Sequence, residues 1–156
     1  MGNIGTLATS IFENEFDSTG ITVASISGWL ENNVGELNNL LYTSFSGVSG
    51  NVSGLNLEEQ NIYQEMFLHH YYKKQSRNTL RGITDNTNNI TSVRDGEQTI
   101  SFVNRNEVSK VYKGLANDAY SRLQDLVYRY NSYQASPRQV GGIESVQQPT
   151  GIVDPR

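Results

Sequence analysis

Glu65 and His69 are the pair of side chains in this sequence best spaced to do chemistry together. Residues four positions apart share a helix face, so this carboxylate and imidazole could supply two ligands to one metal ion. A site needs a third ligand, and the adjacent His70 points about 100° away from His69 on a helix. We therefore expect no metal site, and we interpret both histidines as packed or interfacial residues.

Acid–base or nucleophilic catalysis has little support in the sequence. The adjacent carboxylates Glu58 and Glu59 fit the negative charge favoured in the first turn of a helix. The chain has no cysteine, which excludes a thiol nucleophile, thiolate metal ligands and disulfide bonds. No nucleophile elbow, metalloprotease helix or nucleotide-binding fingerprint is present. We expect a protein that is not an enzyme and that uses no metal or other cofactor.

Charge is distributed unevenly along the chain. Residues 1–72 contain eight acids and no Lys or Arg, whereas residues 73–156 contain twelve bases and eight acids. Four of the bases lie close together, at Lys73, Lys74, Arg77 and Arg81. Such a pattern fits ordinary solvated faces and a helix dipole. It also fits a subunit whose acidic and basic regions meet in repeated contacts, or a basic surface that faces DNA.

Length and hydropathy indicate one domain without a membrane segment. A chain of 156 residues is long enough for a single modest core. No stretch approaches the ~20 apolar residues of a membrane span, and the N-terminus lacks the basic start and apolar run of a signal peptide. We expect the protein to be made in the cytoplasm, with no membrane among its partners.

The first part of the chain predicts an arm and a broken helix. Residues 1–20 are rich in Gly, Asn, Thr and Ser, which predicts an extended N-terminal arm. Residues 21–131 carry apolar residues at steps of three and four and predict a helical domain. Its first helix is expected to begin after a cap at Thr22 and to break near Asn32 and Asn33, because glycines on both sides weaken it.

Two longer helices are predicted in the rest of this domain. The first should begin at a capping box made by Asn56 and Glu59 and end at Gly82. The second should begin near Asn104 or Asn106. Its predicted buried stripe consists of Val108, Val111, Tyr112, Leu115, Ala119, Leu123, Leu126, Val127 and Tyr130.

Two segments interrupt or follow the helical pattern. An Asp95-Gly96 turn between short apolar runs predicts a β-hairpin at about residues 90–103. Residues 132–156 show neither helical nor strand periodicity and contain three prolines, which predicts an extended C-terminal docking arm. The predicted fold class is mainly α: a small helical bundle with a short β-hairpin insertion and extended N- and C-terminal arms.

Aromatic residues are the candidates for subunit interfaces. The chain has nine tyrosines, and tyrosine is enriched at protein interfaces because it combines apolar area with a polar group. Core packing with hydroxyls at the rim is the alternative. The interface candidates are Trp29, Tyr63, Tyr71, Tyr72, Tyr112, Tyr120 and Tyr128.

Several stretches carry a resemblance to a known family. They are DGEQTISFVNRNE from Asp95, YKGLA from Tyr112, LVYRYN from Leu126 and PRQVGG from Pro137. Together with the earlier helix patterns, they resemble head-to-tail connector (adaptor) proteins from the necks of tailed bacteriophages. The resemblance covers about residues 20–142.

The resemblance implies a structural virion protein at the head–tail interface. It implies a twelve-subunit ring that joins the portal protein to tail or nozzle proteins, while double-stranded DNA passes through the lumen. The portal-docking arm it implies is Pro137, Arg138, Gln139, Val140, Gly141, Gly142 and Ile143. The cluster Lys73, Lys74, Arg77 and Arg81 is then a contact or lumen surface. We favour protein contacts for this cluster, because a lumen that lets DNA slide should not grip it.

Two alternatives remain open from the sequence. One is another ring component of the neck or tail, such as a terminator or completion protein. The other is a small helical nucleic-acid-binding protein that uses the basic half of the chain.

Overall fold

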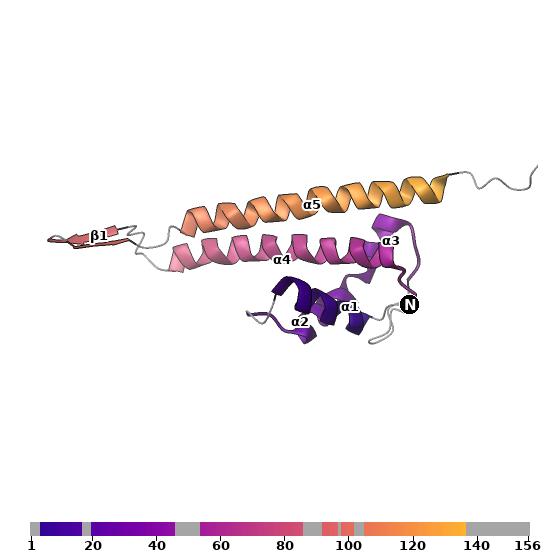
Figure 1. Ribbon diagram of the computed structural model, residues 1–156, viewed down its shortest axis with the longest axis horizontal. Helices are drawn as coiled ribbons and strands as arrows, with labels where there is room; N and C mark the ends of the chain where they lie inside the picture. The colour runs from indigo at the N-terminus through magenta and orange to yellow at the C-terminus, as the bar shows by residue number, and fades with distance from the viewer. Residues whose placement is uncertain are drawn as a thin grey trace, which may run out of the picture.

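The computed structural model describes residues 4–16, 20–45, 54–85, 92–96, 98–101 and 105–136, without the side chains of residues 82–85, 92–95 and 98–101. Within these ranges the protein is mainly helical, which confirms the predicted class. Two long helices, α4 (Leu57–Asp85) and α5 (Arg105–Ala135), lie antiparallel along the molecule. Smaller helices pack against one half of this helical hairpin (Figure 1).

These smaller elements form what we call the N-terminal layer: α1 (Ile4–Ile11), the π-helical turn η1 (Phe12–Phe16), α2 (Val23–Asn32) and α3 (Val34–Leu41). The prediction of an extended N-terminal arm is wrong. The buried residues of α1 are Ile4, Leu7, Ala8 and Ile11. Their spacing makes one apolar helix face, and burying that face outweighs the turn-forming composition around it.

The local signals around α2 and α3 are confirmed. Thr22 caps α2, and its Oγ1 accepts a hydrogen bond of 3.2 Å from the backbone N–H of Ser25. The predicted break lies at Asn33, a turn residue between the two helices. Helix α3 ends at Tyr42, which adopts a left-handed conformation with φ of 53°.

Helix α4 begins as predicted and ends later than predicted. In the capping box, the backbone N–H of Glu59 donates to Asn56 Oδ1 at 2.9 Å, and that of Asn56 donates to Glu59 Oε2 at 2.8 Å. The predicted end at Gly82 is wrong, because α4 continues to Asp85. A glycine inside a helix costs about 1 kcal/mol relative to alanine, which the long contact between α4 and α5 can offset.

Helices α4 and α5 meet along a seam whose α5 positions alternate in steps of three and four, as in coiled coils. The seam residues of α5 are Ser109, Tyr112, Ala116, Ala119, Leu123, Leu126 and Tyr130. Contacts across the seam join Ser76 to Ser109, Tyr72 to Tyr112, His69 to Ala116 and Glu59 to Tyr130. The seam is therefore polar or aromatic at many positions.

The predicted buried stripe of α5 is wrong at two positions. Val111 is 62% exposed and Leu115 is 39% exposed, while Ser109 and Ala116 are buried in their place. Small side chains let the two helices approach closely. The buried hydroxyl of Ser109 is satisfied because it lies 3.0 Å from the hydroxyl of Ser76.

The far end of the helical hairpin carries two short strands, β1 (Ser92–Asp95) and β2 (Gln98–Ser101). They pair antiparallel, with Ser92 opposite Ser101 and Asp95 opposite Gln98. Gly96, between them, has a φ of 61°, which favours glycine. No side chain of either strand is described, so the assignment of the fold to the mainly α class depends on the helices alone.

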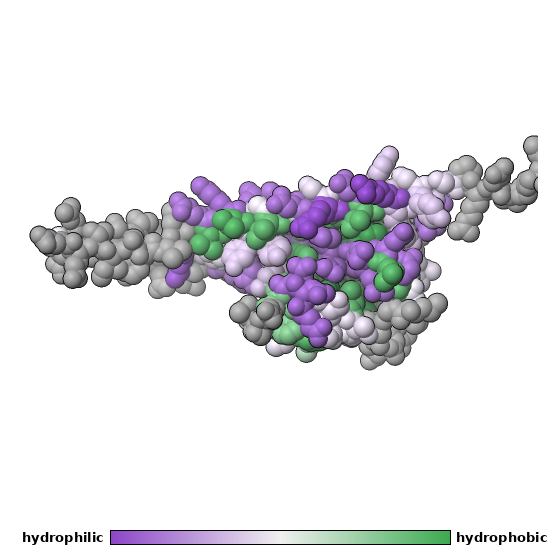
Figure 2. Space-filling model, in the orientation of Figure 1, coloured by the Kyte–Doolittle hydropathy of each residue, from purple (hydrophilic) through white to green (hydrophobic). Residues whose placement is uncertain are grey.

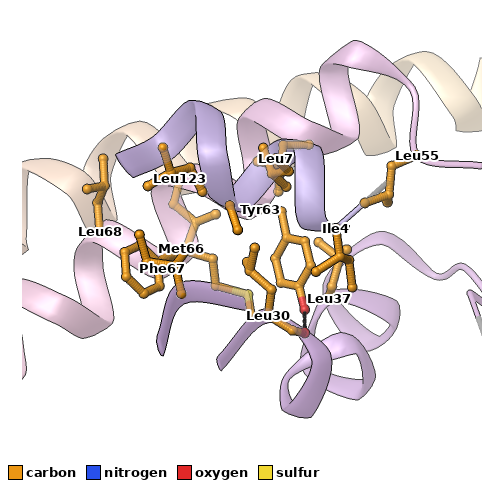
Figure 3. Packing of buried hydrophobic residues seen from close by; sticks show 14 of the residues in the cluster. Ile4, Leu7, Leu30, Leu37, Leu55, Tyr63, Met66, Phe67, Leu68 and Leu123 are labelled. Atoms are coloured by element: carbon orange, nitrogen blue, oxygen red, sulfur yellow. Dashed lines mark hydrogen bonds between the residues drawn. The ribbon is translucent and has the colours of Figure 1, made fainter. Parts of the chain in front are cut away.

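The core lies where the N-terminal layer meets α4 (Figure 3). Tyr63 is fully buried there, and its hydroxyl donates to the backbone carbonyl of Leu30 on α2. This bond satisfies a polar group that would otherwise be costly to bury. Leu30, Leu37 and Ile4 surround the ring of Tyr63.

Two buried tyrosines should make the fold sensitive to alkaline pH. Burial raises the pKa of Tyr63 far above its ordinary value, with the charge of Glu36 adding to the effect. Burial, followed by the hydrogen bond to Glu59, raises the pKa of Tyr130 to about 12 from 10.0. In both cases the folded state holds its proton more tightly than the unfolded state does.

We therefore expect full stability below about pH 10 and a loss of stability as the pH rises from 10 towards 12. Urea unfolding at a series of pH values measures this loss. In Tyr130→Phe the decline over this range should be shallower than in the unmodified protein. An equal decline in both proteins would contradict the assignment to Tyr130.

Candidate assembly surface

The predicted interface aromatics divide into buried and exposed groups. Tyr63 belongs to the core, so its assignment to a subunit interface is wrong. Trp29 packs on Phe67 and His70 with ring centroids 5.4 and 5.1 Å apart. Tyr71 lies 4.7 Å from Phe16, measured between ring centroids. Buried Tyr63 and the partly buried Trp29 and Tyr71 thus hold the N-terminal layer on α4.

The seam uses two more of the predicted aromatics. Tyr72 and Tyr112 stack across it, with ring centroids 6.5 Å apart. Of the predicted set, Tyr120 and Tyr128 are the ones that remain exposed, the latter to 75%. Tyr133, which was not among the predicted interface residues, is exposed to a similar extent.

An open groove of about 760 Å³ lies where α3, α4 and α5 meet. Tyr120 and Tyr128 of α5 line one side, and Lys73 and Arg77 of α4 line another. Glu36 of α3 lies in the same groove and is its acidic residue. The groove therefore combines tyrosine side chains with Arg77, and both residue types are enriched in protein contacts.

The predicted basic cluster continues a face of α4 that begins under the N-terminal layer. Steps of four and three lead along this face from Tyr63 through Phe67 and His70 to Lys74, Arg77 and Arg81. The first two residues are buried, whereas the three cations are exposed. Along this face the side chains thus change from buried aromatic residues to exposed cations.

His70 lies between the aromatic and the cationic part of this face, and both parts affect the pKa of its imidazole. Partial burial lowers the pKa of its imidazole, and the positive charges of Lys74 and Arg77 lower it further. Glu36 acts in the opposite direction. The cations of α4 therefore create a positive field at the edge of the N-terminal layer.

Apolar side chains are exposed in the same uncovered half of the molecule. Val111 and Leu115 lie one turn apart on α5, and Leu80 of α4 is 46% exposed. Figure 2 shows hydrophobic surface along this part of α5. Neighbouring apolar side chains that form a contiguous exposed patch are typical of interaction surfaces.

The pair with metal-ligand spacing, Glu65 and His69, has other partners in the fold. Glu65 Oε1 lies 3.5 Å from Arg122 Nη1, and His69 Nδ1 lies 2.9 Å from the carbonyl oxygen of Ala116. Burial raises the pKa of Glu65, although Arg122 counteracts part of this effect. Among the described residues, no group of three or more His, Cys, Asp or Glu side chains is placed to hold a metal ion.

The predicted C-terminal arm lies mostly outside the described residues. Its first four residues, 132–135, form the last turn of α5, so the predicted start at 132 is wrong. The stretch from Pro137 to Ile143, predicted to dock on a portal, lies outside the described residues. In the described ranges, no helix is long and apolar enough to span a membrane.

Comparisons of the chain with protein-family models, with curated proteins and with solved structures give no match.

Proposed function

We propose that this protein is a structural subunit of a bacteriophage neck. Its copies form a ring that joins the portal to the tail and lets the genome pass. The observation that carries the proposal is the exposed pair Val111 and Leu115 on α5. Two large apolar residues one turn apart, on a face that the described residues leave open, support a repeated protein contact.

The energy of such a contact suits a repeated assembly. Full burial of a Val or Leu side chain contributes about 1.5–3 kcal/mol. One pair of residues cannot hold two proteins together against the entropy lost on association. In a ring, however, each copy contributes the same contact, so one favourable contact per copy is multiplied around the assembly.

The helical hairpin supports a mechanical role. Its two long helices share one seam, which provides a stiff element between the N-terminal layer at one end and the strands at the other. The resemblance adds a docking arm, Pro137 to Ile143, that would enter the portal. On this proposal the protein is made in the host cytoplasm and belongs to the virion neck, with twelve copies in the ring.

The test is co-sedimentation with the portal protein of the same phage. The intact chain is compared with a chain ending at Ser136, which keeps all of α5. We expect the intact chain to bind in a fixed ratio and the shortened chain to lose binding to the portal. Circular dichroism of both chains checks that the helices are retained.

A surface variant distinguishes the contact between copies in the ring from the contact between the tail and the portal. Val111→Asp should leave portal binding by the tail intact but weaken assembly of the ring, because it places a charge in the apolar contact. Thr6→Ala, a substitution of an exposed residue of α1, is the control and should affect neither contact. If the intact chain does not sediment with the portal, the connector proposal fails.

A further inference from the structure

We infer that the cationic face of α4 receives the N-terminal layer of a second copy of this chain. The inference rests on the proposed function in one respect: it names a surface by which copies would join in the ring. This face of α4 carries the stripe Tyr63, Phe67, His70, Lys74, Arg77 and Arg81. The chain's own N-terminal layer covers the first part of this stripe and leaves the cations exposed.

Charge is strongly segregated around this boundary. We define the basic end of the hairpin as residues 73–81 of α4 and 105–115 of α5. It holds seven Lys or Arg residues and one acid, Glu107. The cations are Lys73, Lys74, Arg77, Arg81, Arg105, Lys110 and Lys113, and all of them are exposed.

The N-terminal layer has the opposite charge. Its described residues contain four carboxylates and no Lys, Arg or His: the acids are Glu13, Glu15, Glu31 and Glu36, all exposed. One copy therefore carries an acidic surface and a basic surface on different parts of the molecule. Complementary potentials of this kind steer association and fix its register.

The position of the basic end explains why the partner should be another copy. The layer already packs on the aromatic part of this α4 face, and no other described part of the chain covers the cations further along it. A second layer placed beside the first would extend the cover along α4 and bring its acids to the cations. Glu36 of the chain's own layer already lines a groove with Lys73 and Arg77, which is the same pairing of charges on a smaller scale.

Such a contact is heterologous, because it joins different surfaces of the two copies. Repeated contacts of this type close into a ring when the rotation between copies divides a full turn, and otherwise form an open filament. A heterologous contact of this kind can build the ring of the proposed function. The contact between copies can be tested without the portal protein.

The experiment measures self-association of the full chain by sedimentation velocity. We expect association at about 50 mM salt that weakens clearly at about 300 mM, because exposed charges are screened. Lys74→Glu with Arg77→Glu should weaken association at least about tenfold, and so should Glu13→Lys with Glu31→Lys. A mixture of the two double variants should associate again, because the reversed charges are complementary.

Two controls make the result specific. The single change Arg77→Glu is compared with Arg129→Glu, an exposed cation of α5 outside the basic end. Only Arg77→Glu should weaken association. Circular dichroism shows whether each variant keeps its helices, and restored association in the mixture shows that both double variants are folded.

Three outcomes would overturn the inference. If the chain associates and no charge reversal changes this, the cations are not the contact, although a ring through Val111 and Leu115 survives. If the chain stays monomeric under all conditions, copies do not dock in this way. If the unmodified protein binds a DNA duplex of about 20 base pairs and Lys74→Glu with Arg77→Glu abolishes only that binding, the face recognises nucleic acid instead.

Discussion

Replacing Ile11 with alanine should lower the free energy of unfolding by about 2–5 kcal/mol. Ile11 is fully buried and lies in the core cluster that joins α1 to α2 and α4. The change removes apolar contacts and leaves a cavity in a region where several helices meet. Because native proteins have a free energy of unfolding of only about 5–15 kcal/mol, this single substitution should remove a large share of the protein's stability.

Urea unfolding followed by circular dichroism measures this effect. Thr6→Ala is the matched control, because Thr6 lies exposed on the same helix, and it should change stability by less than about 0.5 kcal/mol. The comparison also tests the position of the N-terminus. In an extended arm, both substitutions would have the same small effect, and that result would contradict the packing of α1 in the core.

Replacing Glu59 with alanine should lower the free energy of unfolding by about 2–4 kcal/mol. The buried carboxylate accepts two hydrogen bonds, from the backbone N–H of Asn56 at 2.8 Å and from the hydroxyl of Tyr130 at 2.7 Å. Its removal opens the capping box of α4 and leaves the hydroxyl of Tyr130 buried without this acceptor. One side chain thus stabilises both the start of α4 and its contact with the end of α5.

Glu58→Ala separates this role from simple charge at the helix N-terminus. Glu58 lies in the same first turn but is exposed, so its loss should cost less than about 1 kcal/mol. A double-mutant cycle of Glu59→Ala with Tyr130→Phe should give a coupling energy of about 0.5–3 kcal/mol. Equal effects of the two alanine changes, or a coupling near zero, would show that the contact between Glu59 and Tyr130 contributes little.

Local hydrogen bonding explains which parts of the fold could be predicted. The cap at Thr22 and the capping box of Asn56 and Glu59 each depend on residues three positions apart, so the amino-acid types are enough to indicate them. The break at Asn33 follows from helix propensity over a short window. The basic cluster was also visible, because charge is a property of the residues themselves.

The candidate site was predicted only in part, because exposure depends on distant elements. Lys73, Lys74, Arg77 and Arg81 are exposed as a surface role requires, and so are Tyr120 and Tyr128. Tyr63 has the same residue type as Tyr128, yet the carbonyl of Leu30 and the surrounding layer make it a core residue. The sequence offers no local signal that separates these two tyrosines.

By itself, the sequence determined the mainly helical class, the caps, the break before α3 and the separation of acidic from basic residues. The tertiary structure alone decided which apolar faces are buried. Helix α1 joins the core despite its turn-rich composition, and Ser109 and Ala116 displace Val111 and Leu115 from the seam. The physical reason is that caps and charge depend on neighbours along the chain, whereas burial depends on which helix faces approach most closely in space.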